Sequence, residues 1–247
     1  MDKSFTTLIL AAGMGKRMES NLPKVLHQLD HKSLVEYVIE LARGVGSDRI
    51  ILIIGHEREM VQEHTRLLDV EYAVQAEQNG TGHAVSMCKD LLKGYDGDVL
   101  VLSGDVPLLT EKSVREALDV HEGTGAAATV FTFAPDDPFG YGRIVRGEAG
   151  EVLGIVEHKD ATDEQKKIGE VNGGIYFFKS APLWEALAKV SNKNASGEYY
   201  ITDTVGLMRA EKHRVSAYLV KDPMEMSGVN SKDQLAELEK YFLEHRK

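Results

Sequence analysis

The chain has 247 residues, and its 29 Lys and Arg against 39 Asp and Glu give a formal net charge of −10. This length suits one α/β domain or at most two small ones, and 43% hydrophobic residues are too many for a disordered chain. The acidic balance argues against a protein that coats nucleic acid or an anionic membrane, but a phosphorylated small molecule needs only a local cluster of positive charge. The single cysteine, Cys88, excludes an intrachain disulfide and favours a reducing setting.

The first half of the chain alternates between short apolar runs and helical patterns. The runs predicted to be buried strands are Phe5–Leu10, Arg49–Ile54, Val70–Gln75 and Val99–Leu102. The segments predicted to be helices are Ser33–Val45, Glu57–Leu68 and Gly82–Leu92. A capping box of Ser33 and Glu36 marks the start of the first helix. Such alternation, with nearly continuous apolar strands, predicts a parallel sheet covered on both sides.

The pattern changes after Ala134. Strands are expected at Arg143–Val145, Val152–Val156, Gly173–Phe178 and Val215–Val220. Helices are expected at Thr162–Lys167, Ala181–Val190, Tyr200–Lys212 and Ser231–His245. Because no low-complexity linker and no internal repeat separates the halves, the second half is expected to extend one mixed, mostly parallel, Rossmann-like sheet flanked by helices.

Phosphate binding is indicated just after the first strand, in the segment Leu10–Met18. Its small residues let backbone N–H groups approach a phosphate closely, and Lys16 and Arg17 add positive charge. Lys24 lies in a following loop that is expected to face the same phosphate site. The segment matches neither the Walker A motif nor the dinucleotide fingerprint. The alternative interpretation is a glycine-rich turn with solvated basic side chains.

Two further segments follow strands of the same predicted sheet. Asp105 comes at the carboxyl end of the fourth strand, where open α/β sheets bind ligands and where a carboxylate can help to hold Mg²⁺. Gln75 opens the loop Gln75–Gly82, and its amide can read the edge of a base because it both donates and accepts. A turn aspartate before a proline and an ordinary polar loop are the alternatives.

The second half places glycines beside polar residues near the ends of its strands, where a ligand can approach the backbone. Glu157 and Asn172 suit sugar hydroxyls and amides, although each also has a structural interpretation. The segment Gly197–Asp203 is either a lid or an aromatic-rich helix start. Asn230 is either a metal ligand or the residue that flanks a helix cap.

The nine histidines form neither a zinc-binding spacing nor a catalytic motif. We interpret His56, His83 and His158 as polar or core-edge residues.

Together these segments resemble the uridyltransferase domain of the bacterial bifunctional N-acetylglucosamine-1-phosphate uridyltransferases, from Leu8 to about Tyr241. The stretches that carry the resemblance are Leu10–Gly13, Leu22–Leu26, Gln75–Gln78, Gly80–Ala84, Gly104–Leu108, Gly140–Ile144, Gly154–Ala161 and Gly197–Asp203. Any one of them is a weak signal, but all of them in order at this spacing are a strong one.

The resemblance implies a glycosyltransferase-A-like nucleotidyltransferase that joins UTP and N-acetylglucosamine 1-phosphate, with Mg²⁺, into UDP-N-acetylglucosamine and pyrophosphate. It implies that the nucleotide is bound by Leu10, Ala11, Ala12, Gly13, Gln75, Gly80 and Thr81. The catalytic residues it implies are Arg17 and Lys24, which contact the phosphates, and the Mg²⁺ ligands are Asp105 and Asn230. The amino sugar is assigned to Gly142, Glu157 and Asn172. On this basis we expect one domain, with a nucleotide-binding half over 1–110, a sugar-binding half over 111–228 and a C-terminal helix over 229–247.

The chain departs from the family pattern at Lys16, where a threonine is usual, at Ser103, where tyrosine is frequent, and at Gly173, where threonine or serine is usual. The acetyltransferase β-helix that follows in the family is not part of this sequence. We therefore expect no acetylation of glucosamine 1-phosphate, from either a stand-alone enzyme or an excised domain. Because that β-helix builds the family's trimer, we expect a monomer.

Several alternatives stay open at this point. The chain could use another sugar 1-phosphate or thymidine nucleotides, or it could be a non-catalytic nucleotide-sugar sensor. A Mg²⁺ phosphohydrolase has less support, because the sequence lacks an Asp-x-Asp motif. The expected partners are two small molecules, UTP and the sugar phosphate, with neither nucleic acid nor membrane, in the cytoplasm.

Overall fold

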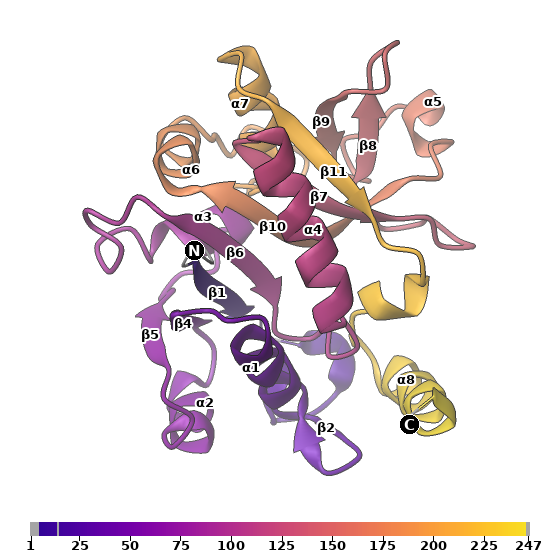
Figure 1. Ribbon diagram of the computed structural model, residues 1–247. Coiled ribbons are helices and arrows are strands. Elements are labelled where there is room, and N and C mark those ends of the chain that lie inside the picture. The colour runs from indigo at the N-terminus through magenta and orange to yellow at the C-terminus, as the bar shows by residue number, and fades with distance from the viewer. Residues whose placement is uncertain (1–4, 14, 246–247) are drawn as a thin grey trace.

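The computed structural model of the protein describes residues 5–13 and 15–245, excluding the side chain of Lys16. Nine strands of this described chain form one mixed sheet in the order β11-β7-β10-β6-β1-β4-β5, with β8 pairing to β10 and β9 to β8 (Figure 1). The strands are β1 (Phe5–Ala11), β4 (Arg49–Ile54), β5 (Glu71–Val74), β6 (Asp98–Ser103), β7 (Ala128–Phe133), β8 (Arg143–Arg146), β9 (Val152–Val156), β10 (Val171–Lys179) and β11 (Val215–Leu219). A small separate hairpin joins β2 (Gln28–Leu29) and β3 (Lys32–Ser33). The predicted fold class is confirmed.

Strand direction brings distant loops to one edge of the sheet. Strands β5, β4, β1 and β6 run parallel, so their carboxyl ends share that edge. Strand β10 runs antiparallel between β6 and β7, with Tyr176 opposite Val101. Because of this direction, the first residues of β10 lie beside the last residues of β6. The loops after β1, β5 and β6 therefore meet the beginning of β10.

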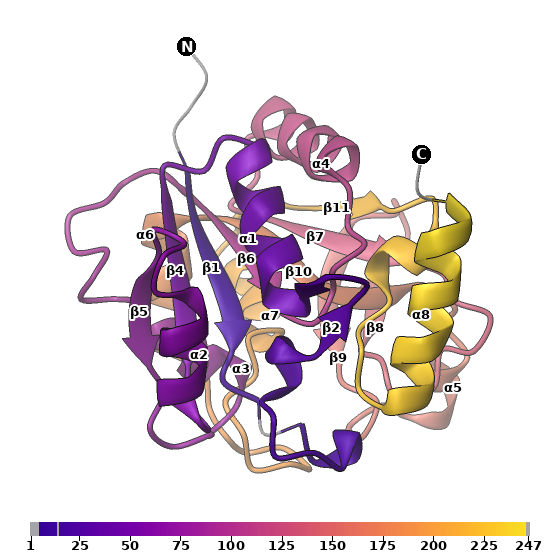
Figure 2. The same ribbon diagram turned by 90° about the horizontal axis from the view of Figure 1, so that it is seen from below.

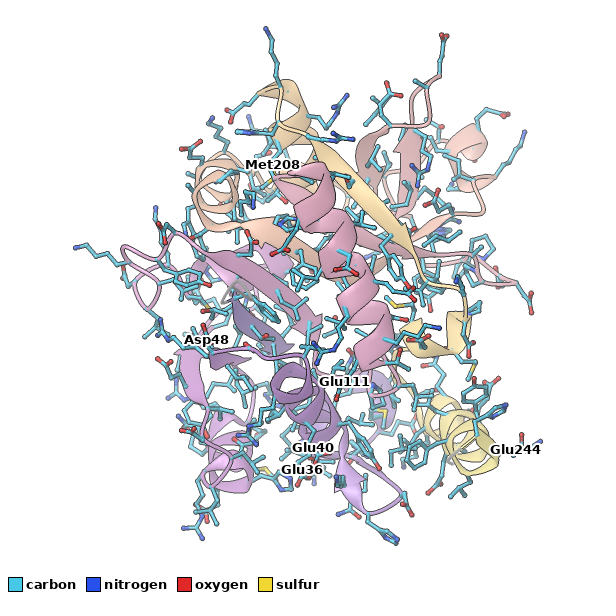
Figure 3. All side chains as sticks on the ribbon, viewed as in Figure 1. Glu36, Glu40, Asp48, Glu111, Met208 and Glu244 are labelled. Carbon is cyan, nitrogen blue, oxygen red and sulfur yellow. The ribbon has the colours of Figure 1, made fainter. Side chains whose placement is uncertain are left out.

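Helices cover both faces of the sheet (Figures 1 and 2). One face packs against α1 (Leu34–Gly44), α2 (Arg58–Thr65) and α4 (Glu111–Thr124), and Figure 3 shows Glu111 at the end of α4 nearest α1. The other face packs against α3 (Thr81–Ser86), α6 (Ser180–Leu187) and α7 (Asp203–Ala210). The strands bury both faces, since Ile9 belongs to the first core and its neighbour Leu8 to the second.

One long helix and one strand of the main sheet were not predicted, and α3 falls furthest short of its expected end. No element was expected between Thr110 and Ala134, where the structure has α4 and β7. The cap was a local signal for α4, because the Thr110 hydroxyl accepts from the Ser113 amide at 3.1 Å. Helix α3 ends at Ser86 rather than Leu92. There the Ser86 hydroxyl donates to the carbonyl of His83 at 2.7 Å, a local bond that competes with helix continuation.

Four short elements and one long helix remain. The short ones are η1 (Lys16–Met18), η2 (Lys24–Leu26), η3 (Pro223–Met226) and α5 (Asp163–Lys166), and the long helix is α8 (Lys232–His245). Leu238 of α8 packs with Met18, Leu29 and Val229 in a third apolar cluster. This packing fixes the start of α8, and with it Asn230, against the loop that follows β1. None of the described helices is long and apolar enough to cross a membrane.

The predicted capping box of Ser33 and Glu36 forms, with the Ser33 backbone N–H donating to the Glu36 carboxylate at 2.8 Å. A second capping box starts α5, where the Thr162 backbone N–H donates to the Gln165 side chain at 2.9 Å.

Candidate active site

A cavity of about 480 Å³ opens at the shared carboxyl edge of the parallel strands. Eight residues assigned from the sequence line it: Leu10, Ala12, Gly13, Lys24, Gln75, Gly80, Thr81 and Asp105. The same cavity is lined by Val25, Gln78, Ala84, Ser103 and Glu198. The structure thus brings the glycine-containing loop after β1 and the loop after β5 together around one space.

Hydrogen bonds from one side-chain amide and one backbone amide fix the positions of these two loops. Gln78 donates from Nε2 to the carbonyl oxygen of Ala12 at 2.6 Å. The backbone N–H of Gln75 donates to the carbonyl of Ile54 at 2.8 Å, which continues the β4–β5 ladder by one residue. Gly80 then turns the chain into α3 with a φ of +105°, a conformation that a side chain would strain. The cavity wall is therefore built before any ligand arrives.

The segment before α7 closes over the start of α3. Tyr199 donates its amide to the Asn79 carbonyl and accepts from the Gly82 amide, each at 2.8 Å. The Ile201 amide donates to the Thr81 hydroxyl at 3.1 Å. This contact pattern shows what the predicted lid or helix start does in the structure: it clamps the Gly80–Gly82 turn and places Glu198 on the cavity wall.

Lys24 and Asp105, which line this cavity, meet the side chain of Asn230. The Lys24 ammonium lies 2.6 Å from Oδ2 of Asp105 and donates to Oδ1 of Asn230 at 3.1 Å. The predicted helix cap beside Asn230 also forms, because the Gln234 amide donates to Ser231 Oγ at 3.2 Å. The two interpretations of Asn230 are thus compatible: its neighbour caps α8 while its side chain faces Asp105.

The Asp105–Asn230 pair fits a magnesium ion. A carboxylate and an amide oxygen are hard donors of the kind that Mg²⁺ prefers, and Mg²⁺ commonly takes only one or two protein ligands beside phosphates and water. In this structure the positive charge between the two oxygens is the Lys24 ammonium, which shows that both oxygens converge on one cation-sized position.

A second cavity of about 220 Å³ adjoins the first, and both are lined by Ser103 and Asp105. Gly142, Glu157 and Asn172, the residues assigned to a sugar, all line this second cavity. A Cβ on Gly142 would lie 3.4 Å from Oε2 of Glu157 and 3.0 Å from Ile155, so glycine lets these groups approach the backbone. Asp105 therefore stands where the nucleotide-side and sugar-side cavities join.

The polar groups of the second cavity are held in fixed orientations. Thr202 donates its hydroxyl to Glu157 Oε1 at 2.9 Å. Asn172 donates from Nδ2 to the Tyr176 hydroxyl at 2.8 Å and accepts from the Gly174 amide at 3.1 Å. A β-bulge between Asn172 and Tyr176, with Gly174 at φ +71°, makes this last contact possible.

Burial raises the pKa of Glu157 above its ordinary value. The Thr202 hydrogen bond opposes this shift, while the charges of Asp160, Asp203 and Glu198 add to it. A carboxylate that is buried among other acids gains from every further donor that reaches it. The arrangement suits a ligand that brings hydroxyl or amide N–H groups.

Some assigned residues lie outside this arrangement. Arg17 sits on η1 with an exposed side chain and is not among the described residues that line either cavity. Ala11, the last residue of β1, is 3% exposed and packs in the hydrophobic core. The side chain of Lys16, the position of one departure from the family, lies outside the described residues.

Several residues that hold the site were not predicted from the sequence. Gln78 lies within the motif Gln75–Gln78 and Thr202 within the segment Gly197–Asp203, but neither has a role predicted for it. His83 was interpreted as a polar or core-edge residue, yet its Nδ1 lies 3.2 Å from Nε2 of Gln75. These residues contact other protein groups at the site, so neither residue type nor spacing marks them in the sequence.

An open α/β sheet whose loops join a nucleotide-sized cavity to a smaller polar one is the arrangement of a nucleotide-binding enzyme. The sequence profile described as nucleotidyl transferase matches residues 6–224, and the chain belongs to this family. This confirms the class of protein that the sequence resemblance indicated.

Three curated relatives share one description, which is more specific than that of the family. Three proteins, each described as bifunctional protein GlmU, come from Geobacter metallireducens (47% identical over 231 residues), Corynebacterium efficiens (45% over 242) and Streptococcus gordonii (45% over 232). The matches cover 93%, 96% and 94% of this chain but only 48%, 50% and 50% of those proteins. The chain thus spans about half the length of the curated relatives it matches.

A solved structure of UDP-glucose pyrophosphorylase complexed with UDP-glucose shares the fold. It superimposes with a TM-score of 0.77, covers the whole of both chains and is 20% identical in sequence.

Proposed function

We propose that this chain transfers UMP from UTP to N-acetylglucosamine 1-phosphate, releasing pyrophosphate and forming UDP-N-acetylglucosamine. The observation that carries the proposal is the junction of two cavities at Asp105, one lined by Gln75 and the loop after β1, the other by Glu157 and Asn172. A nucleotide in the first cavity and a sugar in the second would bring their phosphates together at this junction. The relatives described as GlmU support the choice of substrates.

The proposed reaction needs alignment more than covalent chemistry. A phosphate oxygen of the sugar phosphate attacks the α-phosphorus of UTP, and the new P–O bond forms as the bond to the β-phosphate oxygen breaks. The bonding electrons leave with pyrophosphate. A sugar phosphate is already deprotonated at neutral pH, so the step requires no general base. It does require that repelling phosphate charges be neutralised and held in line.

The chain's own residues supply this neutralisation. Lys24 carries its charge to the junction of the cavities. Arg17, whose exposed side chain lies on η1 beside the loop after β1, is proposed to hold the departing pyrophosphate. Asp105 and Asn230 would hold Mg²⁺, which when bound supplies charge stabilisation to the phosphate oxygens. A cytoplasmic monomer that acts on these two small molecules remains the prediction.

Two related functions compete with this proposal. The fold neighbour described as UDP-glucose pyrophosphorylase supports glucose 1-phosphate as an alternative acceptor. A sensor that binds a nucleotide sugar without turnover would use the same cavities. A sensor, however, has no use for a leaving-group arginine together with a metal-binding pair.

Pyrophosphate release tests the proposal directly. The full chain is incubated with UTP and Mg²⁺, and with N-acetylglucosamine 1-phosphate, glucose 1-phosphate or N-acetylgalactosamine 1-phosphate in parallel. Release that strongly favours N-acetylglucosamine 1-phosphate is the expected result. Release with another sugar would keep the reaction and overturn the acceptor. No release from a folded protein that still binds UTP would favour the sensor.

A further inference from the structure

The Gln75 side chain has only one polar atom left for a ligand. Its Nε2 lies 3.0 Å from the Gly80 carbonyl oxygen and 3.2 Å from Nδ1 of His83. Both hydrogens of the amide are therefore directed at protein acceptors. Within the described part of the chain, no group donates a hydrogen bond to Oε1. Gln75 is 4% exposed and lines the larger cavity.

The Gly80 carbonyl is the first of two acceptors that hold the Gln75 amide in one orientation. A carbonyl oxygen can only accept, and this one also accepts the first α3 hydrogen bond from the Ala84 amide at 3.1 Å. Turning the Gln75 amide over would place Oε1 against this oxygen. The Tyr199 clamp on Asn79 and Gly82 holds the Gly80 turn in place, so the carbonyl cannot swing away.

His83 supplies the second acceptor. Because Gln75 Nε2 is only a donor, Nδ1 accepts and the ring proton lies on Nε2. The ring projects from the first turn of α3 and lies beside the ring of Tyr199, with centroids 6.4 Å apart. The half-buried histidine thus stands on the first turn of α3 with Nδ1 toward the glutamine amide.

We propose that His83 is a specificity-determining positioning residue. Together with the Gly80 carbonyl, it holds the Gln75 amide with Oε1 toward the ligand. The site therefore accepts a base whose N3 carries a hydrogen. The inference rests on the proposed uridine nucleotide. Uracil and thymine carry hydrogen on N3 and can donate to Oε1. Cytosine has a bare N3, so its lone pair would face the oxygen of Gln75. Such an unpaired contact discriminates strongly against the wrong ligand.

Two variants separate the acceptor from the ring. His83→Phe keeps the ring and removes Nδ1, whereas His83→Asn can place its Oδ1 at the position of Nδ1. Binding of UTP, CTP and dTTP to the full chain is measured by isothermal titration calorimetry, which needs no turnover. His31→Phe, on a turn where the His31 side chain is 86% exposed, is the control and should leave all three affinities unchanged.

We expect the UTP-over-CTP affinity ratio to fall about tenfold in His83→Phe, the size of one hydrogen bond, and to stay near wild type in His83→Asn. The UTP-over-dTTP ratio should not change in either variant, because both bases donate from N3. A structural role alone would weaken all three nucleotides together, and that result would overturn the proposal. An unchanged UTP-over-CTP ratio in His83→Phe would overturn it as well. If the wild-type chain binds UTP selectively but releases no pyrophosphate, the proposed reaction fails while this inference stands.

Discussion

The ammonium of Lys24 lies 2.6 Å from the carboxylate of Asp105, in the position where the two predicted metal ligands converge. Both side chains are mostly buried, 18% and 16% exposed, at the junction of the two cavities. A lysine in this place neutralises Asp105 when no other cation does so. The same lysine must release Asp105 before a divalent cation can bind there.

The first prediction follows from that competition. Lys24→Met should bind Mn²⁺, a substitute for Mg²⁺, about fivefold more tightly than wild type in the absence of nucleotide, because the metal no longer displaces a partly exposed ion pair. Isothermal titration of Mn²⁺ into nucleotide-free protein measures the change. Lys32→Met, which removes an exposed pair with Glu40, is the control. Equal Mn²⁺ affinity in Lys24→Met and wild type would show that the ammonium does not compete.

The second prediction concerns turnover. Asp105→Ala and Arg17→Ala should each fold normally and lose about 10²–10³ in turnover, the usual cost of removing one electrostatic contact to the reacting phosphates. Pyrophosphate release gives the rate, and circular dichroism checks the fold. Asp119→Ala, at an exposed position on α4, should retain wild-type turnover. A folded Asp105→Ala protein with near-wild-type turnover would refute the metal assignment.

The third prediction uses the raised pKa of Glu157. Because burial raises this pKa, the folded protein binds the proton more tightly than the unfolded chain, and the ionised carboxylate costs stability at neutral pH. Glu157→Gln should therefore be more stable than wild type at pH 7. A gain of about 1 kcal/mol would raise Tm by about 2–4 °C in a chain of this size.

The stability difference between Glu157→Gln and wild type should depend on pH, and its direction tests the raised pKa of Glu157. Below the ordinary pKa of a glutamate, about 4.3, Glu157 is protonated in both states, and the advantage of Glu157→Gln should vanish. Thermal unfolding at several pH values would show the two curves converging as the pH falls. The amide can still accept from Thr202, so the fold is retained, but KM for the sugar phosphate should rise. An advantage that grows toward acidic pH would contradict the argument.

The fourth prediction concerns Gly173, where the family usually has threonine or serine. A Cβ at this position would fall on the methyl group of Met226, and it would lie 3.0 Å from the Phe131 carbonyl oxygen. Met226 is 2% exposed, so it fills the space that a side chain at 173 would take. Gly173→Ser should therefore destabilise the protein by about 1–3 kcal/mol through overpacking.

A double-mutant cycle tests this pairing. Gly173→Ser should cost about 1 kcal/mol less in a Met226→Ala background than in wild type, because the two sites compete for one space. Urea unfolding gives the four free energies. Gly154→Ser, whose Cβ meets nothing within 4 Å, should change stability by less than about 0.5 kcal/mol. Additive costs at 173 and 226 would mean that the residues do not share the space.

Local pattern was enough to predict much of this protein. The apolar runs became β1, β4, β5 and β6, because a strand that is buried on both faces needs apolar residues at nearly every position. The capping box of Ser33 and Glu36 formed because its partners are three residues apart. The resemblance also allowed candidate nucleotide and sugar residues to be assigned, because their motifs are short and contiguous.

The tertiary structure alone decided which of these residues meet. Lys24 lies 81 positions from Asp105 and 206 from Asn230, and no local rule relates them. Lys24 and Asp105 converge because they follow β1 and β6, which pair in parallel, and Asn230 joins them because α8 packs on Met18 and Leu29. The contact of Thr202 was hidden for the same reason, since its hydroxyl orients Glu157 from 45 positions away. Sequence patterns record what each segment is, whereas sheet order and helix packing decide what lies beside it.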